Sequence, residues 1–102
     1  MQCTPILSTK QPPTAAELQH LFKQTDWANT RSLKEIDKLL LSLDGFVAVR
    51  HGSALIGFGR LITDGIFRAL LEDIIMDEQY RGQGIGRLIV KKLLEQIPDI
   101  ET

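Results

Sequence analysis

The spacing of apolar residues changes twice along the chain and predicts which segments are helices and which are strands. Between residues 14 and 43, apolar side chains recur every three or four positions, which is typical of amphipathic helices. From residue 46 to residue 76 the spacing is close to two, as in half-buried strands. Helical spacing returns after residue 84. The pattern predicts two helices, then three strands, then one helix.

Both helices of the first half carry a start signal. Thr14 is followed by Glu17, and Ser32 by Glu35, at the three-residue spacing of a capping box. Gly45 is expected to end the second helix, because glycine readily adopts the left-handed conformation found after a helix C-terminus. The apolar stripes are Leu18, Leu21 and Phe22 in the first helix, and Leu33, Ile36, Leu39, Leu40 and Leu43 in the second.

Two irregular segments border these helices. A short strand is expected at residues 4–8, and it is interrupted at residues 10–13, where two prolines remove backbone donors. Residues 25–31 connect the helices and contain the only tryptophan, Trp27. We interpret Trp27 as a packing anchor rather than as a platform for a ligand.

The strand-rich part predicts an antiparallel meander, because short turns join consecutive strands. Residues 74–76 are all apolar, as expected where both faces of a strand are covered. The predicted fold is therefore α/β of the α+β kind: a mainly antiparallel sheet flanked by helices, in the order strand, helix, helix, three strands, helix. The expected strands are 46–50, 55–62 and 67–76, and the expected turns are 51–53 and Asp64-Gly65.

Composition narrows the class of protein. The 102 residues are 43% hydrophobic and 25% charged, which fits one domain over residues 1–102. A single cysteine excludes a disulfide framework, argues against a metal site of the zinc-finger kind, and favours a reducing compartment such as the cytoplasm. The net charge of -1 argues against a nucleic-acid partner. No apolar run reaches the roughly 18 residues of a membrane span, so no membrane partner is expected.

Acidic and basic residues are segregated on either side of a glycine-rich loop. Residues 72–78 contain four acids and no base, and residues 81–92 contain four bases and no acid. The loop lies between the last predicted strand and the last predicted helix, which Pro98 stops. The first N–H groups of a helix lack internal partners and carry the positive end of its dipole, and glycines allow a ligand close to the backbone. This arrangement predicts an anion-binding site.

The spacing of the glycines excludes two common nucleotide motifs. A P-loop requires Gly-Lys followed by Ser or Thr, and no glycine in this loop is followed by lysine. A dinucleotide fingerprint requires glycines at relative positions 1, 3 and 6, but the sixth position counted from Gly82 or Gly84 is Arg87 or Ile89.

The motif that does fit is Arg-x-x-Gly-x-Gly, formed by Arg81, Gly84 and Gly86. It resembles the acetyl-coenzyme A motif of the Gcn5-related N-acetyltransferase (GNAT) superfamily. The alternative, a glycine loop that only turns the chain, remains open at this point. The resemblance extends to the segment Leu55-Ile56-Gly57-Phe58-Gly59-Arg60, the strand end Glu72-Asp73-Ile74-Ile75-Met76-Asp77, Tyr80, and the helix from Arg87 to Leu94.

The resemblance implies acetyl-coenzyme A as cosubstrate. In such proteins the loop N–H groups hold the pyrophosphate, and the pantetheine arm lies along the strand end, bonding main chain near Ile74 and Met76. Arg81 and Arg87 either add charge contacts to phosphate or remain solvated. The implied cofactor-binding residues are Ile74, Ile75, Met76, Arg81, Gly82, Gln83, Gly84, Ile85, Gly86 and Arg87.

The resemblance also implies direct attack of an amine on the acetyl thioester, which requires a base and a donor for the oxyanion. The backbone N–H of Ile74 or Ile75 resembles the family's oxyanion donor. Glu72 and Asp73 are the candidate catalytic bases, because they are the only acids on the strand. Being adjacent, they are expected to point to opposite faces, so at most one faces the acetyl group. Alternatively, both are structural or bind a cationic substrate.

Other residue types offer weaker candidates for catalysis. His20 lies on a predicted helix and His51 in a predicted turn, so neither is a persuasive base. Cys3 has no partnered histidine. Tyr80 precedes the loop and resembles the family's packing aromatic rather than its acid.

The sequence also departs from the family pattern. Members of the family continue past the last helix with a strand that opens the cofactor cleft, then a helix that usually supplies an acidic tyrosine, and a hairpin. Here Glu101 and Thr102 fall where that strand would begin, so half of the cleft is expected to be missing. We therefore expect a dimer or larger assembly, pairing or swapping elements near residues 74–76, with weak activity unless a partner completes the cleft.

Three functions follow from these features. The first is transfer of an acetyl group to a small-molecule or peptide amine. The second is a non-catalytic coenzyme A binding module, and the third is a fragment that mainly self-associates. Acceptor contacts are expected from the two N-terminal helices and from Arg60 and Asp64 near the hairpin.

Overall fold

The computed structural model describes residues 5–97. The order of its elements confirms the predicted order of strand, two helices, three strands and helix. Thr4 of the first predicted strand and the helix stop Pro98 lie outside the described residues. No helix within residues 5–97 is long and apolar enough to cross a membrane. The elements are β1 Ile6–Ser8, α1 Ala15–Phe22, α2 Leu33–Leu41, β2 Gly45–His51, β3 Ala54–Thr63, β4 Ala69–Met76, the 3-10 helix η1 Glu78–Tyr80 and α3 Ile85–Leu94.

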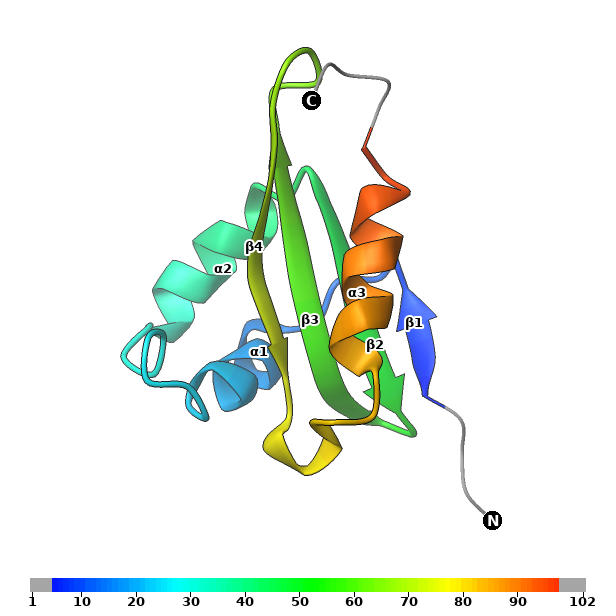
Figure 1. Ribbon diagram of the computed structural model, residues 1–102. Coiled ribbons are helices and arrows are strands. Elements are labelled where there is room, and N and C mark those ends of the chain that lie inside the picture. The colour runs from blue at the N-terminus through cyan, green and yellow to red at the C-terminus, as the bar shows by residue number, and fades with distance from the viewer. Residues whose placement is uncertain (1–4, 98–102) are drawn as a thin grey trace.

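The four strands form one antiparallel sheet in the order β1-β2-β3-β4, with α1 and α2 on one face and α3 on the other (Figure 1). The alternation of side chains along β2 explains the two layers. Phe46 and Ala48 are buried against α1 and α2, whereas Val47 and Val49 are buried against α3. In the same way Ile75 of β4 joins the first cluster and its neighbours Ile74 and Met76 join the second. Both faces of the strands are covered, as the apolar run 74–76 predicts.

The predicted helix starts are confirmed in atomic detail. The N–H of Glu17 donates to the Thr14 hydroxyl at 3.2 Å, and the Thr14 N–H donates to the Glu17 carboxylate at 3.0 Å. The capping box at Ser32 has the same two bonds. The second helix, however, ends at Leu41 rather than near Gly45. The hydroxyl of Ser42 donates to backbone carbonyls of the last turn, and the chain then enters β2 at Gly45.

The hairpin between β3 and β4 is confirmed, but its turn is longer than the dipeptide Asp64-Gly65 suggests. Residues 64–68 form the connection, and β4 begins at Ala69 rather than at residue 67. One carboxylate oxygen of Asp64 accepts the N–H groups of Ile66, Phe67 and Arg68. These backbone bonds lower the pKa of Asp64 and hold the wider turn in place.

Two glycines in β3 allow α3 to lie directly on the sheet. A Cβ atom at Gly59 would be 2.6 Å from Cγ2 of Ile89, closer than packed atoms tolerate, and 3.0 Å from Cδ1 of Leu93. A Cβ at Gly86, in the first turn of α3, would be 2.6 Å from Cε of Met76, the last residue of β4. These close approaches set the position of the first turn of α3 relative to the end of β4.

Candidate functional site

The loop that enters α3 has an unusual backbone. Gly82 and Gly84 have φ of +81° and +84°, a region that residues with a side chain rarely occupy. Gly84 is the N-cap of α3 and supplies no side-chain bond to the helix start. A Cβ atom at Gly82 or Gly84 would have no neighbour within 4 Å, so the space beside both residues is open. The helix start is therefore uncapped and accessible.

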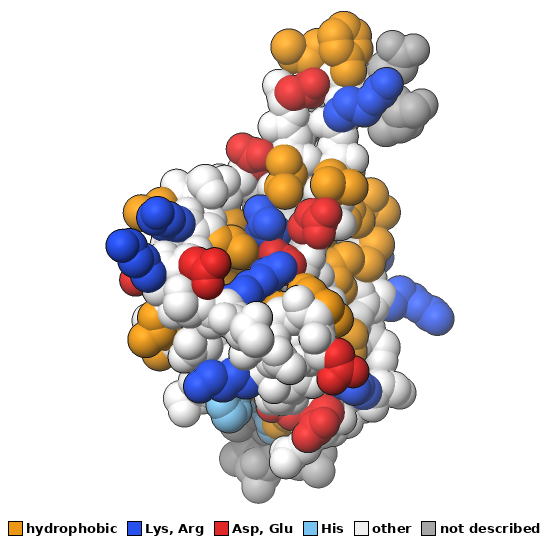
Figure 2. Space-filling model, turned by 90° about the vertical axis from the view of Figure 1, so that its left-hand side faces the viewer, with side chains coloured by type: hydrophobic (Ala, Val, Ile, Leu, Met, Phe, Trp, Pro, Cys, Tyr) orange, Lys and Arg blue, Asp and Glu red, His pale blue; other side chains and the backbone are white. Residues whose placement is uncertain are grey.

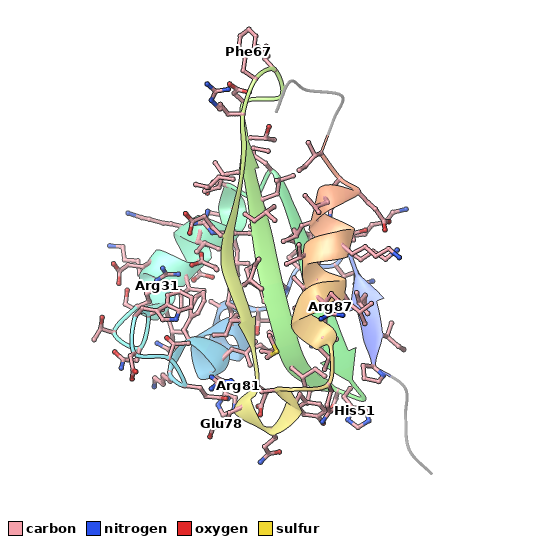
Figure 3. The ribbon with its side chains drawn as sticks, viewed as in Figure 1. Arg31, His51, Phe67, Glu78, Arg81 and Arg87 are labelled. Carbon is pink, nitrogen blue, oxygen red and sulfur yellow. The ribbon has the colours of Figure 1, made fainter. Side chains whose placement is uncertain are left out.

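The N–H groups of this loop have no acceptor within the described part of the chain. Within residues 5–97, no protein acceptor is recorded for the N–H groups of residues 82–87, although those of Arg81 and Leu88 bond to Glu78 and Gly84. Unpaired donors of this kind, together with the positive end of the helix dipole, are able to bind an anion such as a phosphate group. Arg81 and Arg87 are exposed at the two ends of the loop (Figure 3). The side chain of Ile85 is buried in the core, so this residue contributes only backbone.

The end of β4 lies next to this loop. Strand β4 pairs with β3 along one edge, and its other edge has no strand neighbour in the part of the chain that the structure describes. Ile74 and Met76 pack against α3, and Ile75 packs against α1 and α2. Because the other edge is open, main-chain groups along 74–76 are available for an extended ligand.

A bulge in β4 places the two candidate bases differently from the expectation. Arg60 pairs with Glu72, and Phe58 pairs with Ile75, so β4 has one residue more than β3 between these pairs. Asp73 takes up the extra residue with a φ of +55°. Paired residues share a face, so Glu72 lies on the face of Arg60, which Asp73 also contacts. The expectation that the two acids point to opposite faces is therefore wrong, because the bulge interrupts the alternation.

The carboxylate of Asp73 is fully engaged by two arginines. Nε of Arg60 donates to Oδ2 at 2.6 Å, and Nη1 of Arg31 donates to Oδ1 at 3.0 Å. The Asp73 side chain is only 2% exposed. Glu72 is half-buried and takes part in no ion pair among the described residues. The two candidate bases thus have different surroundings: Asp73 is held by two arginines, and Glu72 has no ion-pair partner among the described residues.

A second polar contact joins β2 to η1, just before the loop. Nδ1 of His51, at the end of β2, lies 2.7 Å from the hydroxyl of Tyr80 in η1. Tyr80 also packs against the apolar residues under α3, which agrees with its prediction as a packing aromatic. Sequence reasoning missed this pair because nothing local links residues so far apart in the chain.

A family model described as "Acetyltransferase (GNAT) family" matches residues 10–100. The chain belongs to the GNAT family. This match confirms the predicted resemblance, and the antiparallel sheet with its three helices confirms the predicted fold class.

Two curated relatives show how far the similarity extends. The chain is 25% identical over 99 residues to the uncharacterized N-acetyltransferase ycf52 of Pyropia yezoensis, an alignment covering 93% of this chain and 56% of that protein. It is 40% identical over 43 residues to the chloroplastic GCN5-related N-acetyltransferase 2 of Arabidopsis thaliana, which covers 42% of this chain and 17% of that protein. The chain spans about half the length of the ycf52 proteins that it matches.

Solved structures of GNAT proteins share the fold. An acetyltransferase of the GNAT family from Streptococcus pneumoniae superimposes with a TM-score of 0.79 at 21% identity, covering 96% of this chain and 74% of that one. The GNAT family N-acetyltransferase YhbS of Escherichia coli, solved in complex with CoA, gives a TM-score of 0.74 at 17% identity, covering 95% and 58%. At these identities the likeness concerns the fold.

Proposed function

We propose that this GNAT chain binds acetyl-coenzyme A at residues 81–87 and transfers the acetyl group to a primary amine. The observation that carries the proposal is the row of N–H groups without a protein acceptor at residues 82–87, beside two left-handed glycines at the start of α3. An anion at an uncapped helix start satisfies these donors and the helix dipole together. The pyrophosphate of coenzyme A has this chemistry.

Other residues of the chain would extend the site along β4. Main-chain groups of Ile74 and Met76 face an edge without a strand neighbour among the described residues, and they suit the amide groups of the pantetheine arm. The exposed guanidinium groups of Arg81 and Arg87 flank the loop and suit phosphate oxygens. When bound, acetyl-coenzyme A supplies an activated acyl group.

Glu72 is the better placed of the two candidate bases. Both oxygens of Asp73 already accept guanidinium donors, so this carboxylate is committed to its two arginines. Glu72 is half-buried on the same face and has no such partner, so it can accept a proton from an acceptor ammonium. The backbone N–H of Ile74 or Ile75 remains the proposed donor to the developing oxyanion.

The assembly and the compartment belong to the same proposal. Self-association through β4 is supported by the edge that has no strand neighbour within residues 5–97 and by Leu70, a residue of that strand that is 53% exposed. A cytoplasmic location is proposed from the single cysteine. One relative is named as chloroplastic, so a plastid location is the competing possibility.

Titration calorimetry with acetyl-coenzyme A, followed by a thiol-release assay with a panel of primary amines, tests the proposal. Saturable binding and thiol release that depends on an amine are the expected results. Binding without amine-dependent release would leave only a coenzyme A binding module. Absence of binding would overturn the phosphate site itself.

A further inference from the structure

Two arginines from different elements converge on the face of β4 that carries the proposed base. Arg31 lies in the connection between α1 and α2, immediately before the N-cap of α2, and Arg60 lies on β3. Both donate to the buried carboxylate of Asp73. We propose that these arginines form a subsite for an anionic group of the acceptor, a carboxylate or a phosphate. The inference rests on the proposed acetyl transfer.

Asp73 and the aromatic rings around Arg31 hold both guanidinium groups in fixed orientations. The guanidinium carbon of Arg31 lies 4.7 Å from the centre of the Phe22 ring and 5.5 Å from that of Trp27. Cation–π contacts on this scale orient a guanidinium plane. Trp27 is 57% exposed and belongs to neither core cluster, so the prediction of a packing anchor is wrong, and its ring lies at the surface beside Arg31.

Each arginine keeps donors that the protein does not use. Arg31 bonds Asp73 through Nη1, and Arg60 does so through Nε. Among residues 5–97, no acceptor is recorded for Nε or Nη2 of Arg31, or for Nη1 and Nη2 of Arg60. The two side chains are 31% and 20% exposed, so an anion in solution can reach them. Guanidinium edges of this kind match carboxylate and phosphate oxygens in pairs.

The local charges suit a ligand that carries both signs. Two guanidinium groups and the Asp73 carboxylate leave one positive charge in the cluster, and the carboxylate of Glu72 beside it carries the opposite charge. Glu72 is the cross-strand partner of Arg60 on the same face, yet the two side chains form no ion pair. Figure 2 shows basic and acidic side chains next to one another in the middle of one side of the molecule. An acceptor whose amine lies toward Glu72 and whose anionic group lies toward the arginines complements both charges.

The competing explanation is that the cluster only ties the α1–α2 connection to β4. NMR titration of the arginine Nε–H resonances separates the two, because a purely structural cluster would not respond to small anions. The protein is first saturated with coenzyme A, which occupies the phosphate loop. The probes are propylamine, β-alanine and 2-aminoethyl phosphate, which present a neutral, a carboxylate and a phosphate group beside the same kind of amine.

The expected result is a saturable shift of the Arg31 and Arg60 resonances with one or both anionic amines and none with propylamine. The tighter of the two anions identifies the group recognised. In acetylation assays, kcat/KM should favour that amine over propylamine, and Arg31→Gln should lower the preference at least about tenfold. Arg68→Gln is the matched control, because it removes an exposed arginine from the hairpin turn, outside the cluster. Should Arg31→Gln unfold the protein, Arg31→Lys keeps the charge and still removes the planar edge.

Unshifted resonances together with equal kcat/KM for all three amines would overturn the subsite and leave acetyl transfer standing. Shifted resonances without acetylation of any amine would support the subsite and overturn the proposed transfer. Failure to bind coenzyme A would overturn the proposed function alone, and the same titration of the ligand-free protein would then decide the subsite.

Discussion

The hydroxyl of Tyr80 lies 2.7 Å from Nδ1 of His51, although the two residues are 29 positions apart in the sequence. Their rings meet edge to face, with centroids 5.6 Å apart. The contact joins the end of β2 to η1, which immediately precedes the glycine loop. It therefore links the central sheet to the backbone that forms the candidate phosphate site.

Removing this hydrogen bond should destabilise the fold modestly. Tyr80→Phe deletes only the hydroxyl, so we expect the free energy of unfolding in urea to fall by about 1 kcal/mol. A double-mutant cycle with His51→Leu isolates the contact, because the two losses should then be less than additive. Strictly additive losses would show that the two side chains do not interact.

The left-handed glycine of the loop should be needed for coenzyme A binding. Gly84→Ala adds a side chain in the open space beside the helix start and strains a φ of +84°. We expect calorimetry to show that this variant binds acetyl-coenzyme A at least about tenfold more weakly. Arg81→Ala should reduce the binding free energy of acetyl-coenzyme A by at most on the order of 1 to 3 kcal/mol.

Gly52→Ala is the matched control for this substitution. Gly52 is also left-handed, with a φ of +63°, and a Cβ there also meets nothing within 4 Å. The backbone strain is therefore similar, but Gly52 lies in the turn between β2 and β3, outside the loop. Equal loss of affinity in the two variants would assign the effect to stability rather than to the phosphate site.

The two candidate bases should respond differently to neutralisation. Glu72→Gln should lower kcat by a factor of about 100 and leave acetyl-coenzyme A affinity nearly unchanged. Asp73→Asn leaves two guanidinium groups without their shared carboxylate, so it should cost about 3 kcal/mol in unfolding free energy and act mainly on the acceptor KM. Steady-state kinetics and urea unfolding on the same preparations separate these effects. Small, equal effects on kcat would remove side-chain base catalysis from β4.

Acid should weaken the fold through Glu17. Arg50 donates two hydrogen bonds to its carboxylate and lowers the pKa of Glu17 from 4.5 to about 2. Because the folded state holds the ionised form, this stabilisation is complete above pH 4.5 and is lost as the pH falls toward 2. Glu17→Gln should cost about 1 kcal/mol at pH 6 and progressively less toward pH 2. Urea unfolding of both proteins from pH 6 to pH 2 measures this difference in stability. A difference that does not change with pH would contradict the pairing of Glu17 with Arg50.

The edge of β4 that has no strand neighbour among the described residues should promote self-association. Sedimentation equilibrium at micromolar concentration should give a mass above the 11.5 kDa of one chain. Leu70→Lys places a charge on the exposed position of that strand and should shift the equilibrium toward the monomer. A mass of one chain at this concentration would contradict the proposed assembly.

The sequence by itself determined the features that depend on neighbouring residues. The capping boxes at Thr14 and Ser32, the apolar spacings and the glycines before α3 each act within a few positions, so they could be interpreted without coordinates. They were sufficient to predict the order of elements and the position of the glycine loop before α3. The end of α2 and the width of the hairpin turn were harder to predict, because they depend on hydrogen bonds between the side chains of Ser42 and Asp64 and the backbone.

Only the tertiary structure decided how the face beside β4 is built. The bulge at Asp73 cannot be predicted from alternation, because alternation assumes that every residue of the strand has a partner. Arg31 and Asp73 are 42 positions apart, one in the connection between α1 and α2 and the other in β4. Their contact depends on strand register and on the path of the α1–α2 connection. These are long-range properties, since they arise from packing whole elements together rather than from the order of adjacent residues.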